Sequence, residues 1–370
     1  MLKVYLMLSG GVDSSSSAAK LIELGYDVTC VFMKCWSRDQ LDIMGLSQDL
    51  YACLWEDDLE DARLVSGKLK LAFELWDFQT EYRQKVIDYM LSEYKLGRTP
   101  NPDVMCNSTI KFGMFYNKAM QQGADFVASG HYAKINQFSS KVSTNSKPEI
   151  VIERGLDQKK DQSYFLWRIN KSHLNKILFP IGQFNTKQEV REYASKYNLI
   201  TATKKDSQGL CFVGKTPLRE LLLESIGKKP GQIVDTNGQV LGYHEGAFLY
   251  TIGQREKLGL SGGPWFVSKI DIEDNKIIVS HVDKIEDLFH SKLEVTDLNW
   301  QAFDEPISQF RCQAQIRYHG QIYNCQVEMV ENKAIVTFET PAKSPSTGQS
   351  IVFYENNIML GGGVINKLLD

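Results

Sequence analysis

A turn rich in glycine and hydroxyl groups near the N-terminus is the stretch whose residue types and spacing point most directly to chemistry. It reads Ser9-Gly10-Gly11-Val12-Asp13-Ser14-Ser15 and lies between an apolar run over residues 2–8 and a helical pattern over residues 15–24. Two adjacent glycines let the backbone approach a ligand closely, and the first N–H groups of a helix attract anions. Because a turn that only caps a helix needs one Ser or Asp, the pattern predicts an anion-binding loop at the end of a first strand.

This loop differs from two common phosphate-binding motifs. It lacks the Gly-Lys-Ser/Thr ending of a Walker loop and the three spaced glycines of a dinucleotide fingerprint. As it stands, the segment from Ser9 to Ser15 resembles the pyrophosphate-binding loop of the ATP pyrophosphatase superfamily, whose members split ATP between its α and β phosphates. The resemblance implies ATP as a cofactor, held at Met7, Leu8, Ser9, Gly10, Gly11, Val12, Asp13 and Ser14.

Cys106 is the first of two cysteines whose surroundings favour reactivity. It follows the segment Pro100-Asn101-Pro102-Asp103, in which two prolines predict a rigid, extended turn that cannot continue a helix. A helix predicted over residues 108–122 places the thiol just ahead of a helix N-terminus, where the thiolate is favoured. An isolated cysteine is more often buried and structural, but the rigid turn, the nearby carboxylate and the helix start together favour a reactive thiol.

Cys211 is the second candidate. It lies between two glycines in a stretch flanked by Lys204, Lys205 and Lys215, so we expect a reachable thiol in electropositive surroundings. Those properties suit a sulfur carrier. Because 105 residues separate it from Cys106, only the fold can bring the two thiols together.

Further candidates lie at the expected carboxyl ends of strands. Met33 follows the second predicted strand, and Ser129-Gly130-His131-Tyr132 follows the fourth. In a doubly wound sheet this edge is where ligands bind. Met33 is therefore either an adenine contact or a core methionine, and His131 is either a ligand contact or a structural residue. Gly130 permits close approach of a ligand.

The order of the predicted elements indicates three domains. Alternating strands and helices over residues 1–212 are typical of an α/β fold with a doubly wound, mainly parallel sheet. From residue 213 the pattern is β-rich, with an Asn237-Gly238 hairpin turn, and it predicts a small central domain over 213–285. Alternation of apolar and polar residues over 286–370 predicts a C-terminal β-barrel.

Composition bounds the class of protein. The 370 residues are 43% hydrophobic and 24% charged, which is ordinary for a soluble chain of two or three domains. No apolar run reaches the length of a membrane span and no signal peptide is recognisable, so we expect a cytoplasmic protein without a membrane partner. Seven cysteines without a Cys-x-x-Cys pair predict neither a disulfide framework nor a thiolate metal site.

Charge is unevenly distributed along the chain, although the net charge is only −3. Residues 151–215 carry 12 Lys/Arg against 6 Asp/Glu, whereas residues 286–370 carry 6 against 11. A locally basic stretch can hold a phosphate backbone even in a slightly acidic protein. The middle of the chain therefore favours contact with a nucleic acid, and the acidic C-terminal part presents a repulsive background to one.

Five motifs taken together resemble the bacterial tRNA-specific 2-thiouridylases from end to end. They are Ser9–Ser15, Asn101–Cys106, Ser129–Tyr132, Lys160–Gln162 and Gly209–Phe212. The resemblance implies an adenine nucleotide α-hydrolase-like N-terminal domain, a small central domain and a C-terminal β-barrel. It also implies ATP with Mg2+, the anticodon stem-loop of tRNA as substrate, and a persulfide-donating sulfur-relay protein or cysteine desulfurase as partner.

The same resemblance implies a mechanism with two cysteines. ATP adenylates the oxygen on carbon 2 of the wobble uridine. A persulfide on Cys211 then delivers sulfur, either directly or after reduction by Cys106, and a disulfide between the two remains. Asp103 is an implied acid or base, and Met33 and Gly130 join the nucleotide site. The implied contacts to the base and the tRNA are Asn101, Pro102, Asp103, His131, Lys160, Asp161, Gln162, Arg317, Tyr318 and Gln349.

One position departs from the family pattern. Met7 stands where a small residue is usual, and it either crowds the nucleotide or packs inward.

Two other functions also fit parts of the sequence. A small-molecule carbon–nitrogen ligase would use the same loop without paired cysteines, so Cys106→Ser would leave it active. A nucleotide-gated RNA-binding protein would bind tRNA and release no pyrophosphate.

Overall fold

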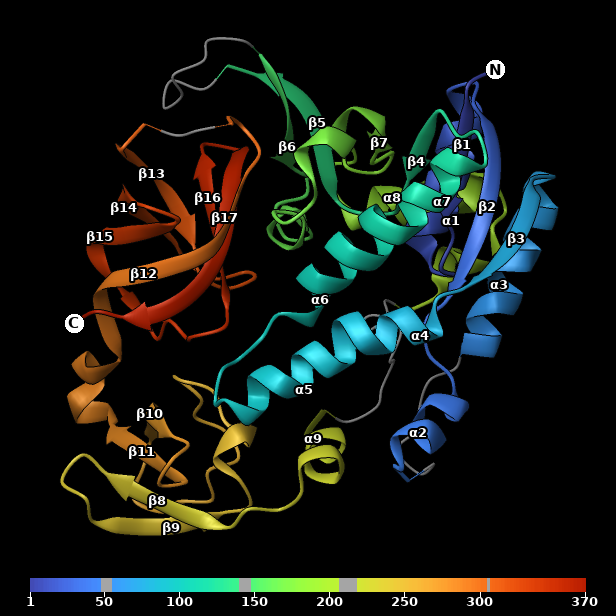
Figure 1. Cartoon of the computed structure of the whole chain (residues 1–370). Helices are drawn as coiled ribbons and strands as arrows, with labels where there is room; N and C mark the ends of the chain where they lie inside the picture. The colour runs from blue at the N-terminus through green and yellow to red at the C-terminus, as the bar shows by residue number, and fades with distance from the viewer. Residues whose placement is uncertain (48–54, 140–147, 206–217, 305–306) are drawn as a thin grey trace.

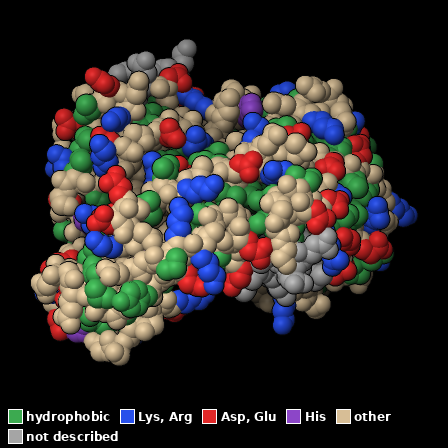
Figure 2. All heavy atoms as spheres, turned by 60° about the horizontal axis from the view of Figure 1, so that its bottom comes forward, with side chains coloured by type: hydrophobic (Ala, Val, Ile, Leu, Met, Phe, Trp, Pro, Cys, Tyr) green, Lys and Arg blue, Asp and Glu red, His purple; other side chains and the backbone are tan. Residues whose placement is uncertain are grey.

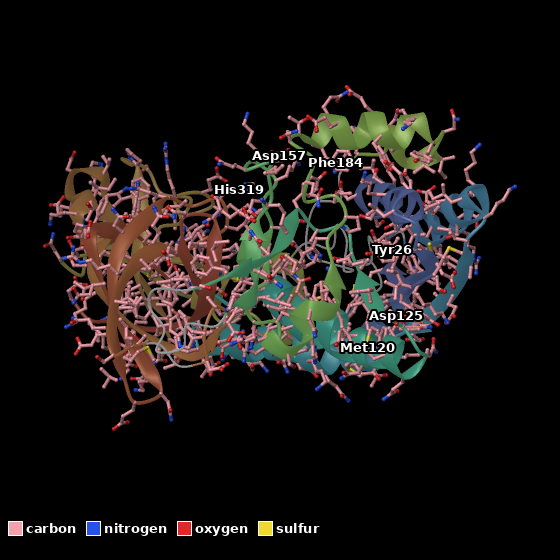
Figure 3. All side chains as sticks on the ribbon, turned by 90° about the horizontal axis from the view of Figure 1, so that it is seen from above. Tyr26, Met120, Asp125, Asp157, Phe184 and His319 are labelled. Carbon is pink, nitrogen blue, oxygen red and sulfur yellow. The ribbon has the colours of Figure 1, made fainter. Side chains whose placement is uncertain are left out.

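The computed structural model describes residues 1–47, 55–139, 148–205, 218–304 and 307–370. Figure 1 shows a sheet covered by helices, a barrel beside it, and a smaller sheet domain below them. Figure 3, seen from above, also places the helix-covered sheet and the barrel side by side. The predicted fold is confirmed: an α/β N-terminal part, a β-rich central part and a C-terminal β-barrel.

The N-terminal sheet is parallel, with the strand order β3-β2-β1-β4-β7. Alternate residues of its central strand face opposite sides, as the strand period requires: Tyr5 and Met7 pack into one core, and Val4 and Leu6 into the other. The strands are β1 (Lys3–Met7), β2 (Asp27–Lys34), β3 (Ala72–Asp77), β4 (Phe126–Ala128) and β7 (Ile177–Leu178).

Helices cover both faces of this sheet. The core that contains Val4 is covered by α1 (Val12–Glu23), α3 (Trp55–Leu69) and α8 (Lys187–Lys196). The opposite core is covered by two longer helical segments that contain π-helical turns. The first comprises α4 (Gln79–Tyr82), Arg83–Ile87 and α5 (Asp88–Lys95), and the second comprises α6 (Pro102–Met105), Cys106–Phe115 and α7 (Tyr116–Gln121).

The second helical segment begins earlier than the sequence pattern predicts. Asn101 caps it, because its side-chain oxygen accepts a hydrogen bond from the Val104 N–H at 3.2 Å. Pro102 is the first helical residue, a position where its fixed φ and missing N–H are tolerated. The prediction that both prolines lie in an extended turn is therefore wrong for Pro102.

The central part is a four-stranded sheet with the order β10-β11-β8-β9. The hairpin predicted at Asn237-Gly238 joins β8 and β9, which are antiparallel, and Gly238 has φ +84°. The strands are β8 (Gly231–Asp235), β9 (Val240–His244), β10 (Trp265–Asp271) and β11 (Lys276–His281). The remaining short helices of the described chain are α2 (Arg38–Met44), α9 (Leu218–Ile226) and the 3-10 turns Ser163–Phe165, Lys171–Lys176, Ile200–Thr203, Ala247–Leu249 and Val282–Leu288.

Six antiparallel strands form the C-terminal barrel, which closes where β12 pairs with β17. They are β12 (Phe289–Trp300), β13 (Gln309–Gln315), β14 (Ile322–Val330), β15 (Lys333–Lys343), β16 (Ser350–Glu355) and β17 (Ile358–Leu368). A hairpin of the N-terminal part, β5 (Ala133–Phe138) and β6 (Glu149–Arg154), extends the same sheet through the pair Ile358 and Glu153. The barrel is thus joined to the N-terminal part by strand pairing.

No helix among the described residues is both long enough and apolar enough to cross a membrane. The predicted domain boundary between residues 212 and 213 lies outside the described residues. The division into 1–212, 213–285 and 286–370 therefore stays a prediction.

Candidate active site

The predicted anion-binding loop lies at the carboxyl end of β1 and leads directly into α1. Its hydroxyl groups hold the turn: the Ser9 N–H donates to Ser14 Oγ at 3.1 Å, and Ser15 Oγ donates to the Gly11 carbonyl at 2.8 Å. Gly130, at the end of β4, packs directly on this turn, because a Cβ there would lie 2.7 Å from the Ser14 backbone nitrogen. The structure thus brings Gly130 and the loop together, as predicted from their positions at the carboxyl ends of β4 and β1.

Asp13, inside the loop, is held by two side chains from distant parts of the chain. The Lys187 ammonium donates to both carboxylate oxygens of Asp13, at 2.7 and 2.8 Å, and the Tyr132 hydroxyl donates to one of them at 2.7 Å. The Lys187 side chain is 14% exposed. Charged hydrogen bonds of this kind are stronger than neutral ones, so the carboxylate is fixed in orientation.

A second lysine supports the loop from its other side. The Lys204 ammonium donates to the Gly10 carbonyl at 3.0 Å and to Asp58 Oδ1 at 2.6 Å, and it also pairs with Asp61. A side chain at Gly10 would collide with the Asp58 carbonyl. The loop is therefore clamped against the start of α3.

Met7 and Met33 lie in the buried core below the loop. Their exposed fractions are 7% and 4%, and both belong to the apolar cluster between the sheet and the helices of residues 79–121. The Met7 side chain therefore packs inward and does not crowd the loop. An adenine contact for Met33 stays a prediction.

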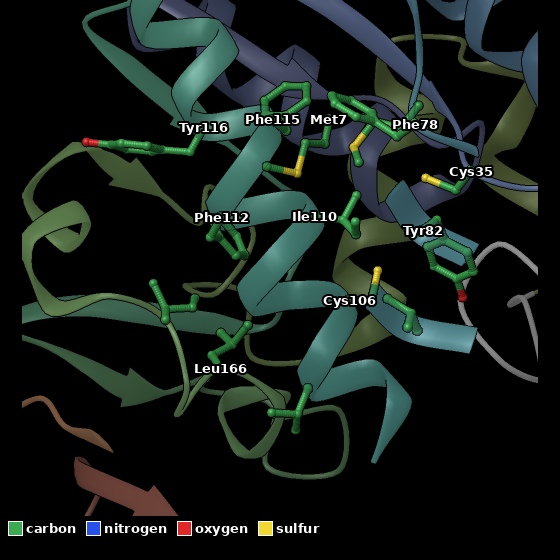
Figure 4. Close-up of a cluster of buried hydrophobic side chains, with 14 of the residues drawn as sticks. Met7, Cys35, Phe78, Tyr82, Cys106, Ile110, Phe112, Phe115, Tyr116 and Leu166 are labelled. Carbon is green, nitrogen blue, oxygen red and sulfur yellow. The ribbon is translucent and has the colours of Figure 1, made fainter. Parts of the chain in front are cut away.

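Cys106 belongs to the same buried cluster. Figure 4 shows its thiol among Ile110, Tyr82 and Cys35, and the residue is 1% exposed. It is the fifth residue of the helical segment that starts at Pro102, so it does not precede the helix N-terminus as predicted. Burial, opposed by the Lys111 charge and aided by a smaller effect of the Asp103 carboxylate, raises the pKa of the Cys106 thiol to about 12. At neutral pH the group is a protonated thiol in this structure.

The segment Asn101-Pro102-Asp103 lies between the sheet domain and the barrel. All three residues are half-buried. Asn101 hydrogen-bonds with Tyr164, and Gln349 of the barrel donates to the Pro100 carbonyl at 3.3 Å. The structure therefore brings the segment close to Gln349, another residue predicted to contact tRNA.

Among the other predicted tRNA contacts, His131 and Asp161 are buried. His131 is 8% exposed, its Nδ1 is 2.6 Å from Ser129 Oγ, and its ring packs against Phe112 and Phe179. Burial, with a smaller effect of the Lys111 charge, holds the pKa of His131 well below its usual value. A contact between tRNA and this neutral imidazole stays a prediction.

Asp161 has internal partners for both carboxylate oxygens. Arg154 donates to it at 2.9 Å, Ser163 donates through its hydroxyl at 2.9 Å, and the N–H groups of Gly155 and Ser163 complete the set. Gln162 accepts a hydrogen bond from the Tyr132 N–H at 3.1 Å, and Lys160 is half-buried. The motif 160–162 thus braces the chain after β6, and its predicted tRNA contacts remain untested.

Arg317 and Tyr318, at the end of β13, also have internal partners. Arg317 donates to the carbonyls of Ile252 and Ser344, both at 2.7 Å, and burial lowers its pKa. Tyr318 packs on Phe165 with a ring-centroid distance of 4.4 Å, and burial raises its pKa to about 12. On the face shown in Figure 2, basic and acidic side chains are interspersed and do not form one basic area.

The second candidate cysteine and possible metal-binding groups complete the survey of the site. Cys211 lies outside the described residues, so its implied disulfide with Cys106 stays a prediction. Within the described ranges, no group of three or more His, Cys, Asp or Glu side chains is arranged to hold a metal ion.

Sequence comparisons agree with the three-part architecture. Residues 2–215 match a family described as tRNA methyl transferase HUP domain, residues 219–281 a tRNA methyl transferase PRC-barrel domain, and residues 290–365 an aminomethyltransferase beta-barrel domain. The tRNA-specific 2-thiouridylase MnmA of Francisella tularensis subsp. novicida (strain U112) is 40% identical over 370 residues, which cover 98% of this chain and 99% of that protein. The chain belongs to the tRNA-specific 2-thiouridylase family.

A second relative and a solved structure were also matched. The tRNA-specific 2-thiouridylase MnmA of Francisella tularensis subsp. holarctica (strain FTNF002-00 / FTA) has the same identity and coverage. A structure of NMN synthetase from Francisella tularensis is 15% identical, covers 55% of this chain and 66% of its own, and has a TM-score of 0.34. The tRNA-specific 2-thiouridylase assignment therefore rests on sequence.

Sequence reasoning did not place three side chains at this loop: Lys187 was not singled out, Tyr132 was named only within the Ser129–Tyr132 motif, and Lys204 only as a flank of Cys211. A local signal existed for one of them. Thr186 and Glu189 form part of a capping box, because Thr186 Oγ1 accepts from the Glu189 N–H at 3.2 Å, and this predicts that α8 starts at Lys187. The start of a helix does not reveal that its first side chain reaches Asp13.

Proposed function

We propose that this protein catalyses ATP-dependent 2-thiolation of the wobble uridine in tRNA anticodons, through adenylation of the uracil oxygen and transfer of persulfide sulfur by Cys106 and Cys211. Family membership supports the general reaction, and one observation supports the mechanism. Cys106 packs in the same buried cluster as Met7 and Met33, the residues at the carboxyl ends of β1 and β2. Figure 4 shows the thiol near Cys35, the residue that follows β2, so Cys106 packs on the face of the sheet to which Met7 of β1 also points.

The chemistry requires activation of a poor leaving group. The oxygen on carbon 2 of uracil leaves only after it is adenylated, and ATP supplies the adenylate with release of pyrophosphate. The loop residues Ser9 to Ser14 would hold the phosphates with backbone N–H groups and hydroxyls, as the N-terminus of α1 favours anions. Mg2+ bound to the phosphates would neutralise their charge, and no side chain of the loop is assigned to it, because both oxygens of Asp13 accept from Lys187.

Sulfur transfer assigns different roles to the two cysteines. A persulfide on Cys211 carries a terminal sulfur that attacks carbon 2 of the activated uridine, and AMP leaves. In the direct route the Cys106 thiol then attacks the inner sulfur of Cys211 as the bond between the two persulfide sulfurs breaks. In the alternative route Cys106 first releases hydrosulfide, which attacks. Both routes end in a disulfide between Cys106 and Cys211 that an external dithiol must reduce.

The target uridine comes from a tRNA, and the sulfur comes from a separate donor protein. Asn101, Pro102 and Asp103 would contact the target uracil, which must leave the stacked anticodon before it can react. Asp103 would act as acid or base, and a persulfide-donating relay protein or cysteine desulfurase would recharge Cys211. We place this activity in the cytoplasm, where such thiol chemistry is maintained by reductants.

Mass spectrometry of nucleosides tests this proposal. Bulk tRNA is incubated with ATP, Mg2+, a cysteine desulfurase system and either wild type, Cys106→Ser, Cys211→Ser or the control Cys325→Ser, a buried barrel cysteine. We expect new 2-thiouridine with wild type and the control only. Thiolation that survives Cys106→Ser or Cys211→Ser would rule out the two-cysteine mechanism. Pyrophosphate release with a small acceptor and no thiolated tRNA would favour a carbon–nitrogen ligase, and tRNA binding without pyrophosphate release would favour an RNA-binding protein.

A further inference from the structure

The short segment Arg98–Pro100, which leads into the Asn101-Pro102-Asp103 motif, is held by both of the other domains. On the barrel side, the Thr99 N–H donates to the Thr347 carbonyl at 2.8 Å. On the central side, the hydroxyls of Thr99 and Thr251 are 3.2 Å apart. The segment is therefore fixed at the backbone from one side and at a side chain from the other.

The barrel contacts come from one turn, residues 344–349, between β15 and β16. Besides the Thr347 carbonyl, this turn supplies Gln349, whose Nε2 donates to the Pro100 carbonyl. Gly348 packs so closely that a Cβ would lie 3.0 Å from both the backbone nitrogen and the carbonyl oxygen of Thr99. The turn and the segment thus pack backbone against backbone with no side chain between them.

The same turn is itself tied to the central domain. Arg317 donates to the Ser344 carbonyl and to Ser346 Oγ in the turn, and to the Ile252 carbonyl next to Thr251. The Tyr164 hydroxyl donates to the Ser350 carbonyl at the start of β16, and Tyr164 also bonds with Asn101. These contacts fix the turn relative to the central domain, through Ile252, and relative to the N-terminal domain, through Tyr164.

We infer that the 344–349 turn of the barrel is a positioning element for the substrate motif: it holds the backbone of residues 98–100 so that Asn101 and Asp103 are presented in one geometry. The inference rests on the proposed function for the role of the motif, but its structural part does not. Gln349 then acts through the Pro100 carbonyl. A misplacement of reacting groups by about 1 Å costs roughly a hundredfold in rate, so such a brace has a measurable consequence.

Gly348→Ala tests the inference with a matched control. The substitution puts a methyl group against Thr99 at a residue with φ +88°. Gly238→Ala, in the β8–β9 hairpin, imposes the same backbone strain at φ +84° but meets no atom within 4 Å. The two variants separate displacement of the segment from the cost of placing alanine in a left-handed conformation.

Two readouts are made on the full-length protein. Hydrogen exchange without tRNA should be faster over residues 98–105 in Gly348→Ala than in wild type or Gly238→Ala. In the thiolation assay, kcat/KM for tRNA should fall roughly tenfold to a hundredfold in Gly348→Ala, while the KM for ATP stays at the wild-type value. If the two variants behave alike, or if exchange over 98–105 is unchanged, the inference is wrong.

A second variant covers the case in which Gly348→Ala does not fold. Gln349→Met keeps the side-chain volume and removes the donor to Pro100, so faster exchange over 98–105 without tRNA is again expected. Unchanged exchange in this variant would contradict the assigned role of Gln349. Wild type that fails to thiolate tRNA would contradict the proposed function alone, because the exchange measurements need no substrate.

Discussion

Lys187 forms a two-point ion pair with Asp13 of the anion-binding loop, with ammonium-to-oxygen distances of 2.7 and 2.8 Å. The two residues are 174 positions apart in the sequence. Asp13 is 32% exposed at its side chain and Lys187 is 14% exposed, so water reaches the pair only in part. The Tyr132 hydroxyl, from the connection between β4 and β5, also donates to Asp13. The first residue of α8 therefore sets the orientation of the one carboxylate in the loop.

Lys187→Met should raise the KM for ATP, because Asp13 loses the partner that holds it and the loop loses its preset geometry. Loss of a charged hydrogen bond is worth about 1.5–3 kcal/mol, which corresponds to roughly a tenfold to hundredfold drop in kcat/KM for ATP. Lys187→Arg should recover part of that loss. Lys196→Met, on an exposed position of the same helix, is the control. Pyrophosphate release measured against ATP concentration checks this, and equal values for the Lys187 and Lys196 variants would refute it.

Cys106 should react slowly with iodoacetamide in the free protein. Its pKa of about 12, raised by burial from the usual value near 9, leaves about a thousandfold less thiolate at pH 8 than an ordinary cysteine has. The alkylation rate should therefore rise with pH beyond pH 9 without reaching a plateau. Peptide mass spectrometry of the native protein, compared with the same protein in urea, measures it. A native rate equal to that in urea would show that the thiol is exposed.

Asp161→Ala should destabilise the protein strongly. The carboxylate is 5% exposed and pairs with Arg154, which also donates to Gln315 of the barrel at 2.9 Å. Removing one partner of a buried pair leaves an unpaired charge and costs about 3–5 kcal/mol. Asp304→Ala removes a carboxylate that is 73% exposed and pairs with Lys171, and such surface pairs are worth about 0–1 kcal/mol. Urea unfolding that gives similar losses for both variants would argue against a structural role for Asp161.

His131 should make the protein sensitive to acid. Burial holds its pKa well below 6.5, so the folded protein keeps the imidazole neutral while the unfolded chain binds a proton as the pH falls below 6.5. Stability is therefore lost on the acidic side, and His131→Asn should lose less of it between about pH 7.5 and 5.5. His319→Gln, at an exposed barrel position, is the control. The measurement is the thermal unfolding midpoint at pH 7.5 and at pH 5.5. A decrease in midpoint between these pH values that is the same in wild type and His131→Asn would contradict the expectation.

Local patterns in the sequence determined the elements and the main motif. The glycine pair after an apolar run predicts the loop after β1, and residue alternation predicts the barrel strands, because turns and strands depend on near neighbours in the chain. The same local reasoning failed at Pro102, where a proline starts a helix and carries Cys106 into the core.

Only the tertiary structure decided which partners the site residues have. Lys187 reaches Asp13 across 174 residues, and Gln349 reaches Pro100 across 249. Contacts this distant depend on how the sheet domain, the central domain and the barrel pack together, and no local period encodes that packing. The sequence therefore predicts which chemistry the chain carries, whereas packing determines that Cys106 is a protonated, buried thiol and that the barrel contacts the segment just before Asn101.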